Sequence, residues 1–241
     1  MKRPEHPGAA VIIPAAGAGL RLGGTKKQFR LIGGKPLLVQ TALLFERHTQ
    51  IDAIVIAAAR NEVDDVARMC RDHGVSKVVS VVPGGEMRQE SVRAGLASLD
   101  SSIEIVLTHD AVRPFVSAVE IDLLLSTLAD HRAAVLAAPV TDTLCRAAGE
   151  CVSERVDRDG IFRLLTPQAF RRDVLELGHE LAAREQKIYT DEVTLVKAIG
   201  ADVALVPCSS PNLKITTPAD WEQAVWMWPA WEARGTINDK R

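Results

Sequence analysis

A run of small residues at positions 14–24 has the composition of a loop that binds phosphate. Backbone N–H groups in such a run can approach an anion without obstruction by larger side chains. The small residues at its start are Ala15, Ala16, Gly17 and Gly19. Two cations accompany them, Arg21 among the glycines and Lys27 just after, and fixed cations can neutralise charge that develops as a phosphate oxygen leaves. An ordinary strand-to-helix turn with solvated charges has a similar composition, so other segments must support this interpretation.

Two better-known phosphate loops do not fit this segment. A dinucleotide-binding loop needs Gly-x-Gly-x-x-Gly, but here the third glycine falls one position late, at Gly23. The acidic residue expected after the next strand is replaced by Arg60. A Walker A loop ends in Gly-Lys followed by Ser or Thr, whereas Thr25 and Lys26 stand in the reverse order. The sequence therefore disfavours a dehydrogenase and a P-loop NTPase.

Two further segments with chemically useful residues follow predicted strands. Asp110 and Arg113 come directly after residues 103–108, where an aspartate can hold a divalent metal and an arginine can grip a phosphate. The other segment contains Gly84, Gly85, Glu86, Arg88 and Ser91. Its glycines permit close approach of a planar base to the backbone. Because ligands bind beyond the carboxyl ends of parallel strands, we expect these segments and the first loop to line one crevice.

Short apolar runs alternate with helical patterns along the chain, which is typical of an α/β protein with a parallel sheet. The predicted strands are residues 9–13, 51–58, 77–82, 103–108, 133–138 and 203–206. The predicted helices between them are residues 36–47, 62–73, 88–99 and 118–130. We therefore predict a Rossmann-like, doubly wound, mostly parallel sheet of about six or seven strands covered by helices on both faces.

The stretch from residue 141 to residue 159 breaks this pattern, because it is polar, alternates weakly and carries a turn around Gly149. It predicts a β-hairpin arm that projects from the core. An isolated hairpin is marginally stable in water, so we expect a homodimer in which the arm packs on that of a second subunit. The four tryptophans lie at 221–231 and predict an apolar helix face, and Pro229 followed by polar residues predicts a frayed tail at 234–241. We expect residues 1–241 to form a single domain.

Composition narrows the partners of the chain. The 29 Lys and Arg against 31 Asp and Glu give a net charge of −2, which provides no general attraction to nucleic acid or to an anionic membrane. No apolar stretch is long enough to span a bilayer or form a signal peptide, so we expect a cytoplasmic protein. The 4 cysteines form no Cys-x-x-Cys pair and predict neither disulfides nor a metal site.

Together, these segments resemble the 2-C-methyl-D-erythritol 4-phosphate cytidylyltransferase family of the nonmevalonate isoprenoid pathway. The resemblance covers about residues 9–220, nearly the whole chain. The matching segments occur in order along the chain, which is far more specific than any one of them. They are Pro14-Ala15-Ala16-Gly17-x-Gly19-x-Arg21, Lys27-Gln28-Phe29, Gly84-Gly85-x-x-Arg88-Gln89-x-Ser91-Val92, His109-Asp110-Ala111-x-Arg113-Pro114, Asp157-Arg158-x-Gly160, Thr166-Pro167-Gln168, Thr190-Asp191-Glu192 and Asn212-x-Lys214-x-Thr216.

The resemblance implies a nucleotidyltransferase fold and a magnesium-dependent reaction of CTP with a polyol phosphate, giving 4-diphosphocytidyl-2-C-methyl-D-erythritol and pyrophosphate. It implies that Arg21 and Lys27 stabilise the transition state, and that Arg158 and Lys214 position the polyol phosphate. It implies nucleotide contacts from Ala15, Ala16, Gly17, Gly19, Gly84, Gly85, Glu86, Arg88 and Ser91. Contacts with the second substrate, and with Mg²⁺ through Asp110, are implied for Asp110, Arg113, Thr143, Thr166 and Thr190.

The chemistry of the residues agrees with this resemblance. A phosphate monoester is mostly dianionic at neutral pH, so it needs no general base before it attacks another phosphate. Alignment of two anions and relief of their charge are what the reaction requires, which matches separated cations without a nucleophilic triad. His109 then has no necessary proton-transfer task, and we predict that it orients the loop beside Asp110.

Several alternatives remain open. Lys26 precedes Lys27, and we assign the catalytic role to Lys27 because Gln28 and Phe29 follow it. Enzymes that transfer cytidylyl to ribitol 5-phosphate resemble the same loop, and Asp157-Arg158-Asp159-Gly160 favours methylerythritol phosphate. A regulatory protein that binds CTP without turnover is a third possibility. Cations placed for both reactants argue against it.

Overall fold

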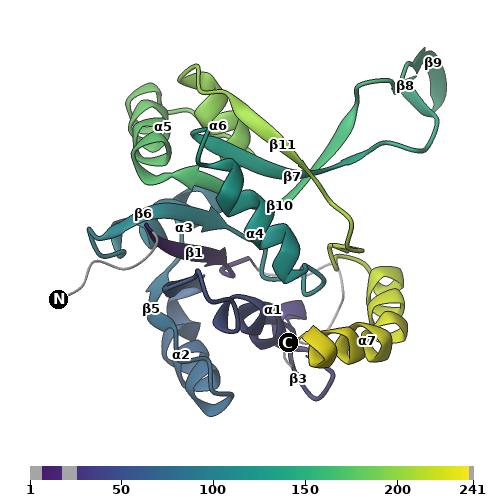
Figure 1. Cartoon of the computed structure of the whole chain (residues 1–241). Helices are drawn as coiled ribbons and strands as arrows, with labels where there is room; N and C mark the ends of the chain where they lie inside the picture. Colours follow the sequence, from purple (N-terminus) through teal and green to yellow (C-terminus); the bar gives the residue numbers. More distant parts are fainter. Residues whose placement is uncertain (1–6, 18–25, 239–241) are drawn as a thin grey trace.

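The computed structural model describes residues 7–17 and 26–238 of the chain. At its centre lies a seven-stranded sheet with the strand order β11-β7-β10-β6-β1-β4-β5 (Figure 1). Its strands are β1 (Gly8–Pro14), β4 (Ala53–Ala58), β5 (Val78–Pro83), β6 (Ile103–Thr108), β7 (Ala133–Pro139), β10 (Phe162–Arg171) and β11 (Val203–Pro207). Neighbouring strands are parallel, except that β10 runs antiparallel to both β6 and β7. The predicted α/β class and mostly parallel sheet are confirmed.

Six of these strands correspond to the predicted apolar runs, and β10 is the strand that the sequence analysis missed. Strand β10 carries two arginines and Pro167, and its ladder with β7 is irregular between Leu164 and Gln168. A proline cannot donate a backbone hydrogen bond to a ladder and argues against a central strand, so the pattern gave a weak signal. Strand β10 nevertheless lies between β6 and β7, where its residues 165–170 are buried.

Helices cover both faces of the sheet (Figure 1). Residues of β1 alternate between two apolar clusters, so that Val11 and Ile13 join one cluster and Ala10 and Ile12 join the other. The first cluster includes buried side chains from α1 (Leu37–Glu46), α2 (Val63–Asp72) and α4 (Ala118–Thr127). The second includes side chains from α3 (Arg88–Ala97), α5 (Arg172–Glu185) and α6 (Glu192–Ala198). This alternation follows from the two-residue period of a strand.

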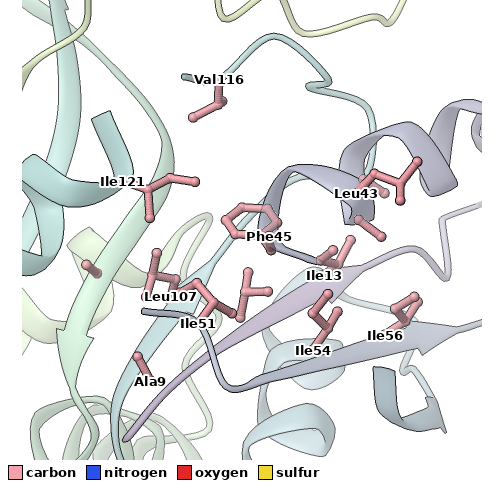
Figure 2. Close-up of a cluster of buried hydrophobic side chains, with 14 of the residues drawn as sticks. Ala9, Ile13, Leu43, Phe45, Ile51, Ile54, Ile56, Leu107, Val116 and Ile121 are labelled. Atoms are coloured by element: carbon pink, nitrogen blue, oxygen red, sulfur yellow. The ribbon is translucent and has the colours of Figure 1, made fainter. Parts of the chain in front are cut away.

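The first cluster packs helix α1 against the central strands of the sheet. Figure 2 shows Phe45 of α1 among Ile13, Ile51 and Leu107, and all four side chains are buried. Interiors of this kind pack as densely as organic crystals, so strand ends that emerge from them have fixed positions. The four helices predicted from the sequence form, with ends that differ by a few residues.

Shorter elements connect these layers. The turns η2 (Lys27–Phe29) and η3 (Arg60–Glu62) follow the ends of β1 and β4, and the small pair β2 (Leu31–Ile32) and β3 (Lys35–Pro36) leads into α1. No helix in the described part of the chain is both long and apolar enough to cross a membrane.

The predicted arm forms a separate two-stranded ladder of β8 (Leu144–Ala148) and β9 (Cys151–Val156), which lie within residues 141–159. Figure 1 shows this hairpin projecting away from the sheet. Gly149 at its turn has a φ of +62°, a conformation that glycine adopts without steric cost. Val152 is 73% exposed, so the hairpin leaves apolar surface uncovered within one chain.

Helix α7 (Pro218–Asn238) is longer than the sequence suggested. Pro229 lies inside it rather than at its end, and residues 234–238, which we placed in a frayed tail, have helical backbone. A proline inside a helix kinks it, and Figure 1 shows α7 changing direction along its length. Residues 239–241 lie outside the described residues. The predicted apolar face exists, because Trp228 packs on Phe115 in a third buried cluster.

Candidate functional site

A cavity of about 200 Å³ opens beyond the carboxyl ends of β1, β5 and β6. Ten of the predicted site residues line it: Ala15, Ala16, Gly17, Lys27, Gly85, Glu86, Arg88, Ser91, Asp110 and Lys214. Three segments far apart in sequence therefore meet at one edge of the sheet, as the topology of a parallel sheet predicts. A larger cavity of about 560 Å³ lies between α1 and α7 and contains none of the predicted residues.

The first wall of the cavity is the loop that follows β1. The Ala15 N–H donates to the Ala57 carbonyl of β4, so the loop leaves the sheet one residue later. The Gln28 side chain is buried, and its Nε2 donates to the Ala15 carbonyl at 3.2 Å and to the Gly17 carbonyl at 3.4 Å. Gln28 thus ties both ends of this loop together. Gly19 and Arg21 lie outside the described residues.

The structure separates the two adjacent lysines. Lys27 lines the cavity at the start of η2. The Lys26 ammonium instead lies 2.7 Å from an oxygen of Glu62, beside the turn that follows β4. Because neighbouring residues on a tight turn point in different directions, one of the two reaches the cavity and the other binds a carboxylate. This placement agrees with the assignment of the catalytic role to Lys27.

The second wall is the turn between β5 and α3, where the backbone comes very close to its neighbours. A Cβ atom on Gly84 would lie 2.6 Å from the Ala16 side chain and 2.7 Å from the Ser91 hydroxyl. Only glycine fits there, so the first and second walls touch. The Ser91 hydroxyl accepts from the Gly85 N–H at 3.2 Å, which fixes the turn. The two walls are therefore held against each other beside the cavity.

At the floor of the cavity, the Asp110 carboxylate is surrounded by three cations. Its Oδ2 accepts from Lys214 Nζ at 2.9 Å and from Arg113 Nε at 3.1 Å, and its Oδ1 accepts from Arg88 Nε at 3.4 Å. Burial alone would raise the pKa of Asp110, but Arg88, Lys214 and Arg113 hold that pKa well below its usual range. Asp110 is therefore a carboxylate at neutral pH, and the cluster carries excess positive charge.

The loop that carries Lys214 is fixed to the same floor. Asn212 has a φ of +35° and is buried, and its Nδ2 donates to the Thr166 carbonyl at 2.9 Å. The Arg113 guanidinium donates to the Asn212 carbonyl at 2.8 Å. Arg113 and Thr166 thus lie beneath the cavity rather than in its lining, where they hold Asp110 and the Lys214 loop in register.

His109 lies directly under Asp110 and is fully buried. The Thr166 hydroxyl accepts the Asp110 N–H at 3.1 Å and lies 3.1 Å from Nδ1 of His109, which accepts its proton because Nε2 carries the ring's own proton. The other ring nitrogen, Nε2, donates to the Arg113 carbonyl at 3.0 Å. Burial lowers the pKa of His109 to about 4, so the ring is neutral at neutral pH. These contacts agree with the predicted orienting role.

The structure does not bring three predicted residues to this cavity. Thr143 and Arg158 are exposed on the arm, and the Arg158 guanidinium donates to the Thr141 carbonyl there. Thr190 is exposed in the turn before α6. The sequence pattern could not fix the positions of Thr143 and Arg158, because nearly all residues of the arm strands are exposed in this chain.

The donor set fits only a loosely held metal ion. Among residues 7–17 and 26–238, no group of three or more His, Cys, Asp and Glu side chains is placed to hold a metal. Asp110 is the buried carboxylate of the cavity, and both its oxygens already accept from cations. Mg²⁺ commonly takes one or two protein carboxylates and fills its other positions with water and substrate phosphates. The residues therefore fit an ion carried mainly by a bound nucleotide.

Two residues with evident roles at the site were missed as functional residues in the sequence analysis. Gln28 ties the first loop together, and Glu192 lies buried against Arg88. Both fall inside the motif segments, Gln28 directly after Lys27 and Glu192 two residues after Thr190, so proximity to assigned residues was an available signal. Their burial could not be predicted from the sequence, because glutamine and glutamate side chains are usually exposed.

Comparison with known proteins agrees with this geometry. The sequence profile of the family described as IspD: 2-C-methyl-D-erythritol 4-phosphate cytidylyltransferase matches residues 9–227. A protein of that name from Salinibacter ruber is 46% identical over 222 residues, which cover 92% of this chain and 93% of the relative. One from Halalkalibacterium halodurans is 42% identical over 212 residues, with coverage of 88% and 92%.

A solved structure of the same family also matches this chain. The crystal structure of 2-C-methyl-D-erythritol 4-phosphate cytidylyltransferase from Thermus thermophilus superposes with a TM-score of 0.75 at 31% identity. The match covers 92% of this chain and 99% of that one. Because the family profile and the relatives span nearly the whole chain, the resemblance inferred from the motifs is confirmed. The chain is an enzyme that belongs to the 2-C-methyl-D-erythritol 4-phosphate cytidylyltransferase family.

Proposed function

We propose that the protein transfers the cytidylyl group of CTP to 2-C-methyl-D-erythritol 4-phosphate, giving 4-diphosphocytidyl-2-C-methyl-D-erythritol and pyrophosphate. The observation that carries this proposal is the set of cations around one cavity, Lys27 in its lining and Arg88, Arg113 and Lys214 around Asp110. Two anionic reactants repel each other, and a cavity with excess positive charge offsets that repulsion.

The reaction needs no general base from the protein. The polyol phosphate is mostly dianionic at neutral pH, and one of its oxygens attacks the α-phosphorus of CTP. A new P–O bond forms as the bond to the leaving pyrophosphate breaks. Lys27 neutralises charge on the nucleotide phosphates as this happens, and Arg21, which lies outside the described residues, is proposed for the same task. His109 is neutral and buried beneath the floor, so it holds structure instead of moving a proton.

The nucleotide base is proposed to bind in the cavity beside the first two walls, where Ala16, Gly85 and Ser91 line it. The close contact of Gly84 with Ala16 and Ser91 fixes the two walls against each other. Lys214, at the floor, is 46% exposed in its side chain and is proposed to receive the polyol phosphate with Arg158. Mg²⁺ would neutralise charge on the triphosphate, and Asp110 is the residue proposed to hold it.

Arg158 and Thr143 lead us to propose a homodimer. Both are exposed on the arm and outside the cavity lining of their own chain. An arm that reaches a second subunit would deliver them to the partner's cavity and cover the exposed Val152. Thr190, in the turn before α6, is proposed as a further contact with the polyol.

The test is pyrophosphate release from CTP with Mg²⁺ and 2-C-methyl-D-erythritol 4-phosphate. We expect turnover with CTP, much slower turnover with UTP or ATP, and loss of turnover when EDTA removes the metal. Ribitol 5-phosphate is assayed in parallel. Faster pyrophosphate release with ribitol 5-phosphate than with 2-C-methyl-D-erythritol 4-phosphate would identify the related ribitol-5-phosphate cytidylyltransferase. CTP binding without pyrophosphate release for either polyol phosphate would instead identify a regulatory protein.

A further inference from the structure

Glu192 is an ionisable group buried beneath the candidate site with no role in the proposed chemistry. It is 1% exposed and begins α6 after the N-cap Asp191, whose side chain accepts the Thr194 N–H. Its Oε2 accepts from a guanidinium nitrogen of Arg88 and from the Thr108 hydroxyl at 3.1 Å. One carboxylate oxygen therefore joins the start of α6, the start of α3 and the end of β6.

Arg88 depends on this carboxylate for its position. The guanidinium donates through Nη1 to Glu192 and through Nε to Asp110, while its buried Nη2 makes no hydrogen bond to any residue that the structure describes. These two carboxylates are its ion-pair partners, and Asp110 is shared with Lys214 and Arg113. Among the residues that the structure describes, Glu192 is thus the ion-pair partner that Arg88 does not share with Arg113 or Lys214.

Stability alone is a weak reason for such a pair. Burying two charges costs desolvation free energy that their attraction only partly offsets, and apolar residues of the same volume are often as stable. What a buried pair adds is a fixed direction for the guanidinium. Arg88 lines the cavity, so the direction of its side chain affects what the cavity binds.

We propose that Glu192 is a positioning residue that holds Arg88 in the orientation needed to bind the nucleotide. This inference rests on the proposed function, because it takes CTP as the ligand of the cavity that Arg88 lines. Glu192 touches neither substrate, and it acts through the ion pair with Arg88 and through its hydrogen bond with Thr108.

The test compares E192Q, R88A and the double variant in steady-state kinetics. Glutamine keeps the size of the side chain but removes its charge, so E192Q should raise the KM for CTP about tenfold or more. The KM for the polyol phosphate should stay within about twofold. Because Glu192 acts through Arg88, E192Q should add no further rise in the KM for CTP in the R88A background.

E46Q is the matched control, since Glu46 lies away from the cavity and binds Ser76 and the Lys77 N–H. It should leave both KM values unchanged. If E192Q does not fold, T108V replaces it in the test, because T108V removes the hydroxyl that donates to Glu192. T108V should raise the KM for CTP by a smaller factor than E192Q. T108S keeps the hydroxyl and should have a KM for CTP near that of the wild type. A normal KM for CTP in a folded E192Q or T108V variant, or additive effects of E192Q and R88A, would overturn the proposal.

CTP binding measured by calorimetry, with no polyol phosphate present, separates this inference from the proposed function. If the wild type binds CTP but releases no pyrophosphate, the proposed transfer is wrong, and weaker CTP binding by E192Q would still support the positioning role. If the wild type turns over and E192Q binds CTP normally, the positioning role alone is wrong.

Discussion

Removing the charge of Asp110 should destabilise the protein far more than removing an exposed carboxylate. In D110N the amide has nearly the shape of the carboxylate, but Arg88, Arg113 and Lys214 lose their shared counter-ion. The Asp110 and Arg113 side chains are 11% and 10% exposed, and that of Arg88 is 24% exposed, so water replaces little of the lost attraction. Lys214 is 46% exposed and contributes less.

The expected loss follows from these distances. One ion pair at a separation of 2.9–3.4 Å amounts to about 5 kcal/mol at an effective dielectric constant of about 20. Breaking a buried pair by removing one partner costs about 3–5 kcal/mol, because the remaining charge stays buried. We expect D110N to lose about that much unfolding free energy, despite the opposing gain from no longer desolvating the Asp110 carboxylate.

Urea unfolding of D110N and of D173N makes the comparison. Asp173 pairs with Arg132 on the surface, where the two side chains are 68% and 63% exposed, and such pairs contribute about 0–1 kcal/mol. D173N is therefore the matched control, because it makes the same Asp-to-Asn change at a solvated ion pair. An equal, small loss of unfolding free energy in both variants would refute the view that Asp110 anchors the buried cations.

Three further predictions address the catalytic lysine, the buried histidine and the arm. K27A should lower kcat by orders of magnitude, because Lys27 lines the cavity. K26A removes only a contact with Glu62 outside the cavity and should retain most of the wild-type kcat. Similar losses of kcat in the two variants, measured in steady-state assays, would contradict the assignment. Burial lowers the pKa of His109 from 6.5 to about 4, so between these pH values the unfolded state binds more protons than the folded state. The unfolding free energy should therefore fall by up to about 3 kcal/mol through His109 as the pH falls from 6.5 to 4. Urea unfolding at several pH values should show a shallower dependence in H109N, and an unchanged slope would be the contrary result. If Arg158 serves the partner's cavity, mixing inactive K27A and R158A chains should restore about a quarter of wild-type activity through mixed dimers, whereas no restored pyrophosphate release would place Arg158 in its own chain's site.

Much of the fold could be predicted because parallel strands buried on both faces are continuous apolar runs. Residues 103–108 appear as a strand with the bounds that the sequence pattern gave, and β1 differs by one residue at each end. Strand β10 was missed because Pro167 and its terminal arginines weaken the pattern, and tertiary packing between β6 and β7 overrides that local signal. Pro229 and the polar residues after it predicted a frayed tail at 234–241, whereas helix α7 continues to Asn238 and its Trp228 packs on Phe115.

The site was predictable where topology alone decides position. Segments after β1, β5 and β6 had to meet at one edge, so Ala16, Ser91 and Asp110 could be placed together from their order in the chain. The ion pairs could not be predicted, because the partner of Arg88 comes from Glu192, 104 residues away. Thr143 and Arg158 lie on the exposed arm, outside the cavity lining of their own chain, so sheet topology did not place them at the site.

A crystal structure with a non-reactive CTP analogue and 2-C-methyl-D-erythritol 4-phosphate tests the central claim most directly, that fixed cations hold two anionic reactants in line. We expect Lys27 Nζ within about 3 Å of a triphosphate oxygen and Lys214 Nζ at a similar distance from the polyol phosphate. The attacking oxygen should lie opposite the bond to the leaving pyrophosphate. Both reactants bound with these ammonium groups turned toward solvent would contradict the account.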